Sequence, residues 1–294
     1  MKSKIAMVPI TIALVVCLAV APAMADWWPG DDHKMHFPQT PMPGGWDVEF
    51  ASSRLADDWL CTETGPVTDI HFWISWYQDM VQPIGDIRIG IWSNNPSGPL
   101  GWSQPNVLLW DRIFTASDIT IVEWEPDLQG WYDPSSGGYL PDNHMRRFQI
   151  NIEEIPQPHI QQDGVIYWLE IDFGPLPFIG WKESEPHWND AAVFWYSPFW
   201  WAIADPITGG AIDLAFVITG PCCNHDGIRG DADYSMGLDV GDLTYLVAYL
   251  FQGGPAPPCL EEGDVDGSGA IDVGDLTYLV AYLFQGGPAP PPCP

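Results

Sequence analysis

Hydrophobic and polar residues alternate with a period of two along much of the chain before residue 220. In the first clear run, Ile70, Phe72, Ile74 and Trp76 share one face, and the residues between them share the other. Four further runs repeat this alternation, at 87–92, 148–153, 165–171 and 212–218, and clusters of Gly, Pro, Asn and Asp separate them. Short alternating runs between turn signals predict a mainly β domain over 46–220, an antiparallel, jelly-roll-like β-sandwich.

The pattern changes near Gly220-Pro221. The segment Asp239–Pro258 recurs without change at 272–291, an offset of 33 residues, which indicates a tandem duplication. In the second copy Leu276, Leu279 and Leu283 lie on one helical face, and Gly-Gly-Pro follows as a stop signal. Residues 221–294 are therefore expected to form a small domain of two helical repeats.

The first 25 residues are predicted to be a signal peptide. Lys2 and Lys4 precede an apolar run, and Ala23-Met24-Ala25 has the small-x-small form of a cleavage site. The run is short for a membrane span, and no later stretch is apolar enough to cross a bilayer. We expect a secreted protein, extracellular or at the cell surface, without membrane insertion. Residues 26–45, rich in Pro, Gly and His, are expected to form an irregular arm.

The net charge of the chain limits the kinds of partner that it can bind. The chain has 39 acidic against 10 basic residues and a net charge of -29. Nucleic acids and anionic membranes require basic neutralising groups, so neither is an expected partner. The balance suits divalent cations and high solubility.

Each repeat carries the ligand spacing of a twelve-residue calcium loop, which places oxygens at positions 1, 3, 5, 7, 9 and 12. The second loop supplies them from Asp264, Asp266, Ser268, the Ala270 carbonyl, Asp272 and Asp275. The first loop supplies them from Asp231, Asp233, Ser235, the Gly237 carbonyl, Asp239 and Asp242.

The sixth position separates the two loops. Gly269 stands there in the second loop and Met236 in the first, where the chain must turn sharply. A non-glycine residue at positive φ costs on the order of 1 kcal/mol, although Gly237 can absorb part of the turn. The loop sequences therefore predict weaker calcium binding in the first loop.

Residues 229–294 resemble a type I dockerin. The resemblance rests on Gly230-Asp-x-Asp-x-Ser, on Gly263-Asp-Val-Asp-Gly-Ser-Gly, on Asp at position 12 and on the following Leu-Thr-x-Leu helix. It implies two Ca²⁺ ions that fold the module, and duplicated helices that bind a cohesin-like domain on a scaffold protein. The alternative is a pair of Asp-rich turns without metal.

The resemblance also implies which positions contact the partner, namely loop positions 10, 11, 17 and 18. The family often has hydroxyl and basic residues there, whereas this chain has Val240, Gly241, Val247, Ala248, Val273, Gly274, Val280 and Ala281. Calcium binding therefore carries over better than cohesin specificity. Because the helices are apolar nearly all round, intramolecular packing is the alternative use of these residues.

Five cysteines remain after cleavage, and export permits disulfides. Cys222 and Cys223 are expected to bridge to Cys259 and Cys293, with the pairing open. The odd residue, Cys61, is expected to be a buried free thiol.

The preceding domain, over about 45–220, resembles an uncharacterised family of secreted bacterial domains. The stretches Leu55–Trp73 and Gly180–Asp190 carry this resemblance, which implies a β-sandwich and no known activity. All 17 tryptophans of the chain lie between Asp26 and Gly220, that is, in this domain and the arm before it. Aromatic faces flanked by polar groups suit sugar rings, and Trp181, His187, Trp188, Asn189 and Asp190 make such a cluster. The alternative is that the tryptophans fill the core.

The sequence contains no recognisable catalytic site. Carboxylates such as Glu183 and Glu185 are too close in sequence to face each other across a glycosidic bond, and no Gly-x-Ser-x-Gly motif is present. We therefore expect a non-catalytic calcium-binding module that docks on a cohesin-like partner and whose sandwich can bind polysaccharide. The alternatives are a polysaccharide-active glycoside hydrolase carried by a dockerin, and a structural surface protein whose calcium repeats only stabilise the fold.

Overall fold

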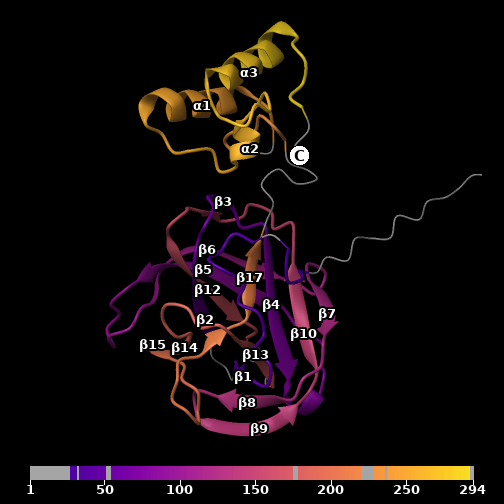
Figure 1. Ribbon diagram of the computed structural model, residues 1–294, viewed down its shortest axis with the longest axis vertical. Coiled ribbons are helices and arrows are strands. Elements are labelled where there is room, and N and C mark those ends of the chain that lie inside the picture. Colours follow the sequence, from indigo (N-terminus) through magenta and orange to yellow (C-terminus); the bar gives the residue numbers. More distant parts are fainter. Residues whose placement is uncertain are drawn as a thin grey trace, which may run out of the picture.

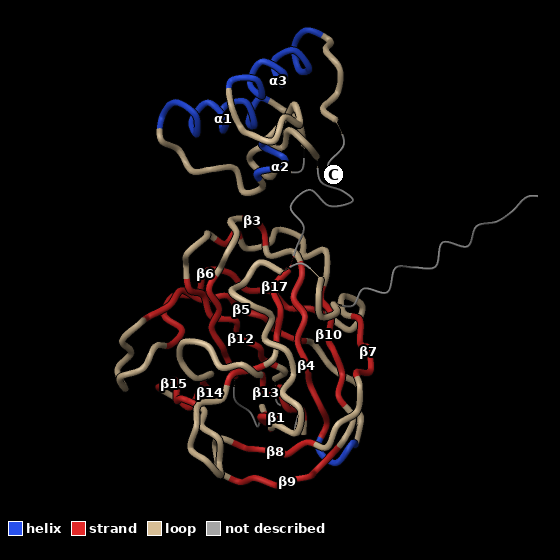
Figure 2. The backbone as a smooth tube through the Cα atoms, in the orientation of Figure 1, coloured by secondary structure: helices blue, strands red, loops and turns tan. Residues whose placement is uncertain are grey.

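The computed structural model describes residues 27–31, 33–50, 54–174, 178–219, 228–235 and 237–291. The signal peptide predicted for 1–25 and the boundary predicted at Gly220-Pro221 lie outside these residues. Within them the protein is mainly β, and the α-helices are confined to the C-terminal module (Figure 2).

Two large sheets make up the region before residue 220. The larger has nine strands, in the order β7 (Thr120–Trp124), β10 (Arg147–Ile152), β4 (Asp69–Trp76), β13 (Ile179–Ser184), β1 (Trp46–Glu49), β8 (Gln129–Asp133) and β9 (Gly138–His144), with β16 (Asp213–Leu214) paired to β13 and β17 (Phe216–Thr219) paired to β4. The other has six strands, in the order β15 (Phe199–Ala202), β14 (Val193–Tyr196), β2 (Leu55–Leu60), β12 (Ile166–Asp172), β5 (Ile87–Asn95) and β6 (Gln104–Phe114).

Two small elements complete this region. Strands β3 (Gly65–Pro66) and β11 (Ile160–Gln161) form a two-stranded sheet, and a 3₁₀ turn, η1 (Tyr77–Asp79), follows β4. Among the described strands, the pairing of β1 with β8 is parallel and the others are antiparallel. The expectation of a purely antiparallel domain is therefore wrong at this one pair.

The alternating runs predict strands correctly. Strands β4, β5, β10 and β12 coincide with four of the runs, and the fifth run is divided between β16 and β17. Their apolar faces meet in one core, in which Phe72 and Ile150 of the larger sheet and Ile89 and Leu169 of the smaller sheet are fully buried. Two sheets over a common core are consistent with the predicted sandwich.

The second face of the larger sheet is also covered. His71, Trp73 and Ser75 alternate with the core residues of β4, yet all three are buried. The N-terminal arm covers part of this face, because the Trp27 carbonyl accepts a hydrogen bond from Gln149 Nε2 and the Trp27 ring meets Trp73 edge to face. The arm is irregular, as predicted, and joins the sheets through isolated bridges such as Gln39 with Phe216.

The C-terminal module contains α1 (Val240–Gln252), α2 (Leu260–Gly263) and α3 (Val273–Gln285), and it lies beyond the β3 end of the strand-rich region (Figure 1). Its small core is built from Leu246 of α1, Leu276 and Leu279 of α3, and the loop residues Ala232 and Val265. None of the helices described has the length and apolar character needed to span a bilayer.

Candidate functional site

The two long helices of the module begin at an acidic residue that caps them. Asp239 precedes α1 and Asp272 precedes α3, and each forms a capping box with the residue three positions later. Both helices end at a glycine in the left-handed conformation, Gly253 and Gly286. Identical sequences thus give identical helices, and each capping box brings a loop carboxylate to the helix start.

Three carboxylates converge in each loop. Oxygens of Asp231, Asp233 and Asp242 lie within 4.8 Å of one another. Asp264, Asp266 and Asp275 form the equivalent group in the second repeat. These are positions 1, 3 and 12 of each predicted loop, and no other group of this kind occurs among the described residues.

The remaining predicted ligands border these clusters. In the second loop the Ser268 hydroxyl lies 3.4 Å from Asp264 Oδ1 and 3.3 Å from the Ala270 carbonyl oxygen. In the first loop the Ser235 backbone N–H donates to Asp231 Oδ1 at 2.8 Å. Position 5 of the second loop therefore carries an oxygen next to Asp264, and the position 7 carbonyl lies beside that hydroxyl.

The aspartates at position 9 act on the helices. Asp239 accepts a hydrogen bond from the Gly241 N–H, and Asp272 accepts one from the Gly274 N–H. A Cβ atom at Gly241 would lie 2.7 Å from Asp233 Oδ2 and 2.9 Å from Asp239 Oδ1. Gly241 and Gly274, which the resemblance places at partner-contact positions, therefore make room for the carboxylates.

Burial and mutual repulsion raise the affinity of these clusters for protons. Desolvation, with the charges of Asp233 and Asp231, raises the pKa of Asp242 to about 7. Desolvation and the neighbouring Asp266 and Asp264 also raise the pKa of Asp275. Oxygen donors with excess negative charge are what a hard divalent cation prefers, so the residues present fit calcium.

The two loops turn with different residues. Gly267 and Gly269 have φ of +73° and +92° in the second loop, whereas Tyr234 of the first loop has φ of 59° at the position equivalent to Gly267. Met236, predicted to hinder the turn, lies outside the described residues. Gly237 is not among the left-handed residues, so the structure does not support its predicted part in the turn.

An exposed apolar face runs along each long helix. Val240 and Phe251 of α1 are 60% and 62% exposed, and Val273 and Phe284 of α3 are 53% and 64% exposed. The other predicted contact residues on the two helices are half-buried: Val247, Ala248, Val280 and Ala281. Phe251 and Phe284 were not among the predicted contact residues, although their helical spacing from Val240 and Val273 indicates a shared face.

The cysteine predictions can be followed at two positions. Cys259 is disulfide-bonded, and its sulfur also accepts a hydrogen bond from the Glu262 N–H at the start of α2. The other candidates, Cys222, Cys223 and Cys293, lie outside the described residues. Cys61 is a buried free thiol, as predicted, and burial raises its pKa to about 11.

The predicted sugar-binding cluster does not form a single surface. Trp181 is fully buried in the core, and its indole N–H donates to the Ala215 carbonyl oxygen. His187 and Asn189 are exposed, Trp188 and Asp190 are half-buried, and His36 stacks on Trp188 at 4.1 Å between ring centroids. The structure thus separates Trp181 from the other four residues.

Most tryptophans belong to the interior. More than half of the 17 are buried: Trp27, Trp46, Trp59, Trp73, Trp76, Trp131, Trp168, Trp181 and Trp200. Only Trp28 and Trp201 are well exposed, and they lie on different parts of the domain, since Trp28 stacks on Trp124 of β7 whereas Trp201 lies in β15. A flat face with several exposed tryptophans is therefore absent from the described residues.

Two buried aspartates, Asp58 and Asp213, support the 187–190 loop, and neither was predicted from the sequence. His187 Nδ1 lies 2.6 Å from Asp213 Oδ1, and Asn189 Nδ2 donates to Asp58 Oδ2. Burial raises the pKa of Asp58 to about 8 and that of Asp213 to about 6, and it raises the pKa of Asp57 well above its usual value.

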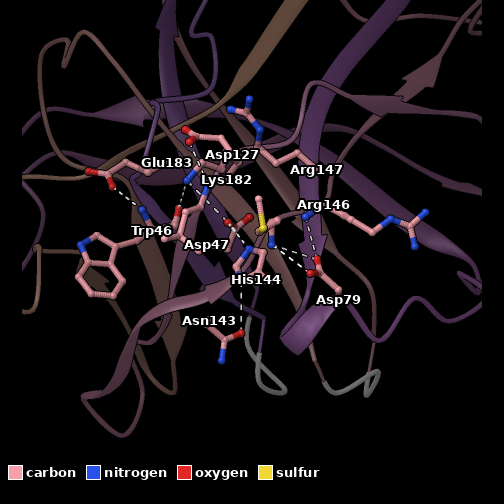
Figure 3. A network of polar contacts seen from close by, with 12 residues as sticks. Trp46, Asp47, Asp79, Asp127, Asn143, His144, Arg146, Arg147, Lys182 and Glu183 are labelled. Atoms are coloured by element: carbon pink, nitrogen blue, oxygen red, sulfur yellow. Dashed lines mark hydrogen bonds and ion pairs between the residues drawn. The ribbon is translucent and has the colours of Figure 1, made fainter.

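A second buried polar network joins β1, β9 and β13 (Figure 3). Asp47 Oδ2 lies 2.9 Å from His144 Nε2 and 3.6 Å from Lys182 Nζ, and Lys182 Nζ donates to the Trp46 carbonyl oxygen. All three side chains are fully buried, and desolvation lowers the pKa of Lys182. The network satisfies buried charges inside the sheet and offers no surface to a substrate.

One open hollow of about 410 Å³ adjoins the ends of β6 and β10. It is lined by Arg112, Ile113, Phe114, Asp118, Glu153, Glu154 and Pro156. Its carboxylates do not form a convergent group like those of the two loops. Among the described residues, the strongest candidates for a functional site are therefore the two clusters of three aspartates in the C-terminal module.

Comparison with known proteins reaches only the β-rich region. Residues 35–219 match a family described as "Domain of unknown function (DUF7901)". Among curated proteins no similar protein was found. Among solved structures no similar structure was found.

Proposed function

This chain belongs to the DUF7901 family, whose description names no activity, and we therefore propose its role from the C-terminal module. In this proposal the protein is a secreted, non-catalytic calcium-binding module that attaches through a dockerin-like tail to a cohesin-like partner. The observation that carries the proposal is the recurrence of one Asp cluster at equivalent positions of two tandem repeats.

The chemistry of the clusters supports two Ca²⁺ ions, one in each loop. Every side chain in the two clusters is a carboxylate, and two of the three in each cluster are buried. Between residues 228 and 291 the sequence has a single basic residue, Arg229, so the module contains little positive charge of its own. Two bound cations would neutralise part of this excess and hold each loop against the start of its helix.

The twin helix faces support docking. A small domain normally buries its large apolar side chains, yet Phe251 and Phe284 are the most exposed ones on α1 and α3. Each lies on the same face as the exposed valine at the start of its helix, Val240 or Val273. The partner surface that fits such a face is apolar, unlike the polar contact expected from the family's usual residues.

In this proposal the sandwich is the domain that the dockerin-like tail attaches to the partner. A glycan-binding role for it has less support, because Trp181 is buried and the exposed tryptophans lie apart. A glycoside hydrolase would need two carboxylates across a cleft, and the hollow beside Glu153 and Glu154 has no such convergent pair. If the repeats only stabilise the fold, the helix faces need no partner, and this is the alternative that the experiment must separate.

Calcium-dependent capture tests the docking role. The immobilised mature chain should retain one protein from the native envelope fraction in calcium and release it in a chelator. Replacing both phenylalanines, Phe251→Asp with Phe284→Asp, should abolish retention without loss of helix content, because both side chains are exposed. The matched control is Leu109→Asp on β6, an exposed apolar residue of the sandwich. Retention that survives the chelator or the double substitution would contradict docking through these helices.

A further inference from the structure

The two repeats carry side chains of opposite charge at one pair of equivalent positions. Arg229 and Glu262 each stand two residues before the first aspartate of a loop, and the 33-residue offset relates them. The side chain of Arg229 is 9% exposed and Glu262 is 2% exposed. Side chains of opposite charge are thus held at corresponding places before two loops that share their acidic ligand positions.

Arg229 reaches across to the second loop. Its Nη1 atom donates to the Asp264 carbonyl oxygen at 2.6 Å and to Asp264 Oδ2 at 3.2 Å. Asp264 occupies position 1 of the second loop and belongs to its carboxylate cluster. A guanidinium charge therefore lies directly beside the second candidate cation site.

Glu262 reaches in the opposite direction, to the first loop. Its carbonyl oxygen accepts the Gly230 N–H at 2.7 Å, and its Oε1 atom accepts the Ile228 N–H at 3.2 Å. These two contacts hold Glu262 against the residues that lead directly into Asp231 of the first cluster. Its other oxygen, Oε2, is buried and has no hydrogen-bond partner among the described residues.

We infer that this exchange sets the order in which the two loops bind calcium, with the first loop filling before the second. Glu262 gives the first site a further buried carboxylate from the other repeat, which strengthens its attraction for a divalent cation. Arg229 weakens the attraction of the second site because its positive charge borders Asp264. This order is opposite to the one that the loop sequences alone predict, and the inference rests on the proposed calcium function.

A calcium titration of the mature chain, followed by calorimetry, tests the order. Asp275→Asn disables the second site and Asp242→Asn the first, so that each Kd is measured alone. Glu262→Gln should raise the Kd of the first site at least tenfold and leave the second within a few-fold. Arg229→Gln should lower the Kd of the second site several-fold, and Arg229→Lys should not. Circular dichroism at saturating calcium checks that each variant folds.

The matched control is Glu261→Gln, which removes the same charge from the exposed neighbour. If Glu262→Gln changes the first Kd no more than this control does, the inference is overturned while the calcium function stands. The inference is also overturned if the second site of the unmodified chain is the tighter one. If the unmodified chain takes up no calcium, both the proposed function and this inference are wrong.

Discussion

Gly237 and Gly269 allow the effect of one backbone angle on the stability of the loops to be measured. A Cβ atom added at either residue would meet nothing within 4 Å, so neither substitution creates a clash. They differ in backbone conformation, since Gly269 has φ of +92° and Gly237 is not left-handed. Only at Gly269 is an L side chain strained.

Gly269→Ala should therefore lower the free energy of unfolding of the calcium-loaded module by about 1 kcal/mol. Gly237→Ala should leave it unchanged or raise it by about 0.5 kcal/mol, because alanine restricts the unfolded chain more than glycine does. Chemical denaturation followed by far-UV circular dichroism measures both. An equal cost at the two positions would show that the first loop also turns at its seventh residue.

Asp58 makes the sandwich sensitive to pH. Its pKa is 3.8 in a solvated carboxyl group and about 8 in the fold, where burial disfavours the charge. The raised pKa adds stability that is complete below pH 4 and is lost as the pH rises through 8. Asp57 and Asp213 shift in the same direction, so they add to the effect.

Asp58→Asn should thus stabilise the sandwich at pH 9, on the order of 2 kcal/mol, and change little at pH 5. Asparagine keeps an oxygen to accept from Asn189 and carries no charge. Thermal unfolding followed by tryptophan fluorescence reports this domain alone, because no tryptophan follows Trp201. The exposed Asp163→Asn is the control, and a gain that is equal at both pH values would argue against ionisation of Asp58 as its cause.

At the scale of the element, α2 depends on Cys259 in two ways. The residue is disulfide-bonded, and its sulfur caps the helix by accepting from the Glu262 N–H at 3.3 Å. Serine can cap a helix as well as or better than cysteine. A serine substitution therefore removes the disulfide and keeps the cap.

Cys259→Ser should destabilise the module by about 2–4 kcal/mol, the usual contribution of a native disulfide. The loss should appear in the helical circular dichroism signal and leave tryptophan fluorescence unchanged. Cys61→Ser, at the free thiol, is the matched control and should not affect the helices. Peptide mapping under non-reducing conditions would identify which of Cys222, Cys223 and Cys293 is the partner. A module as stable without the disulfide as with it would contradict this role.

The strands that could be predicted from the sequence are those in which apolar residues occupy every second position. Strand β4 was predicted from its alternation, whereas β6 was not, because its exposed Val107, Leu108 and Leu109 interrupt the pattern. Alternation placed His71 and Ser75 on the face of β4 opposite the core, and it did not indicate that this face is also buried. Which loops cover a sheet face depends on tertiary contacts that no local pattern contains.

The same limit applies to the candidate site. Positions 1, 3 and 12 of each loop were predicted from spacing, and the structure brings them together. The contacts of Arg229 and Glu262 were not predicted, because each residue contacts the other repeat. Spacing along the chain describes one loop at a time.

At the scale of the whole molecule, the electrostatic difference between the loops outweighs their difference in turn residues. Left-handed strain at Tyr234 costs on the order of 1 kcal/mol. Arg229 Nη1 lies 3.2 Å from Asp264 Oδ2, and at an effective dielectric constant of about 20 two unit charges this close interact by several kcal/mol before solvent screening. The order of filling is therefore expected to follow Glu262 and Arg229.

The account as a whole depends on calcium binding by the module and not by the sandwich. The most direct measurement is the amount of Ca²⁺ bound per mature chain, with helix content and tryptophan fluorescence recorded in the same titration. We predict two ions per chain, a gain of helical signal with unchanged fluorescence, and loss of both ions in the variant Asp242→Asn with Asp275→Asn. No uptake, or equal uptake by the double variant, would contradict it.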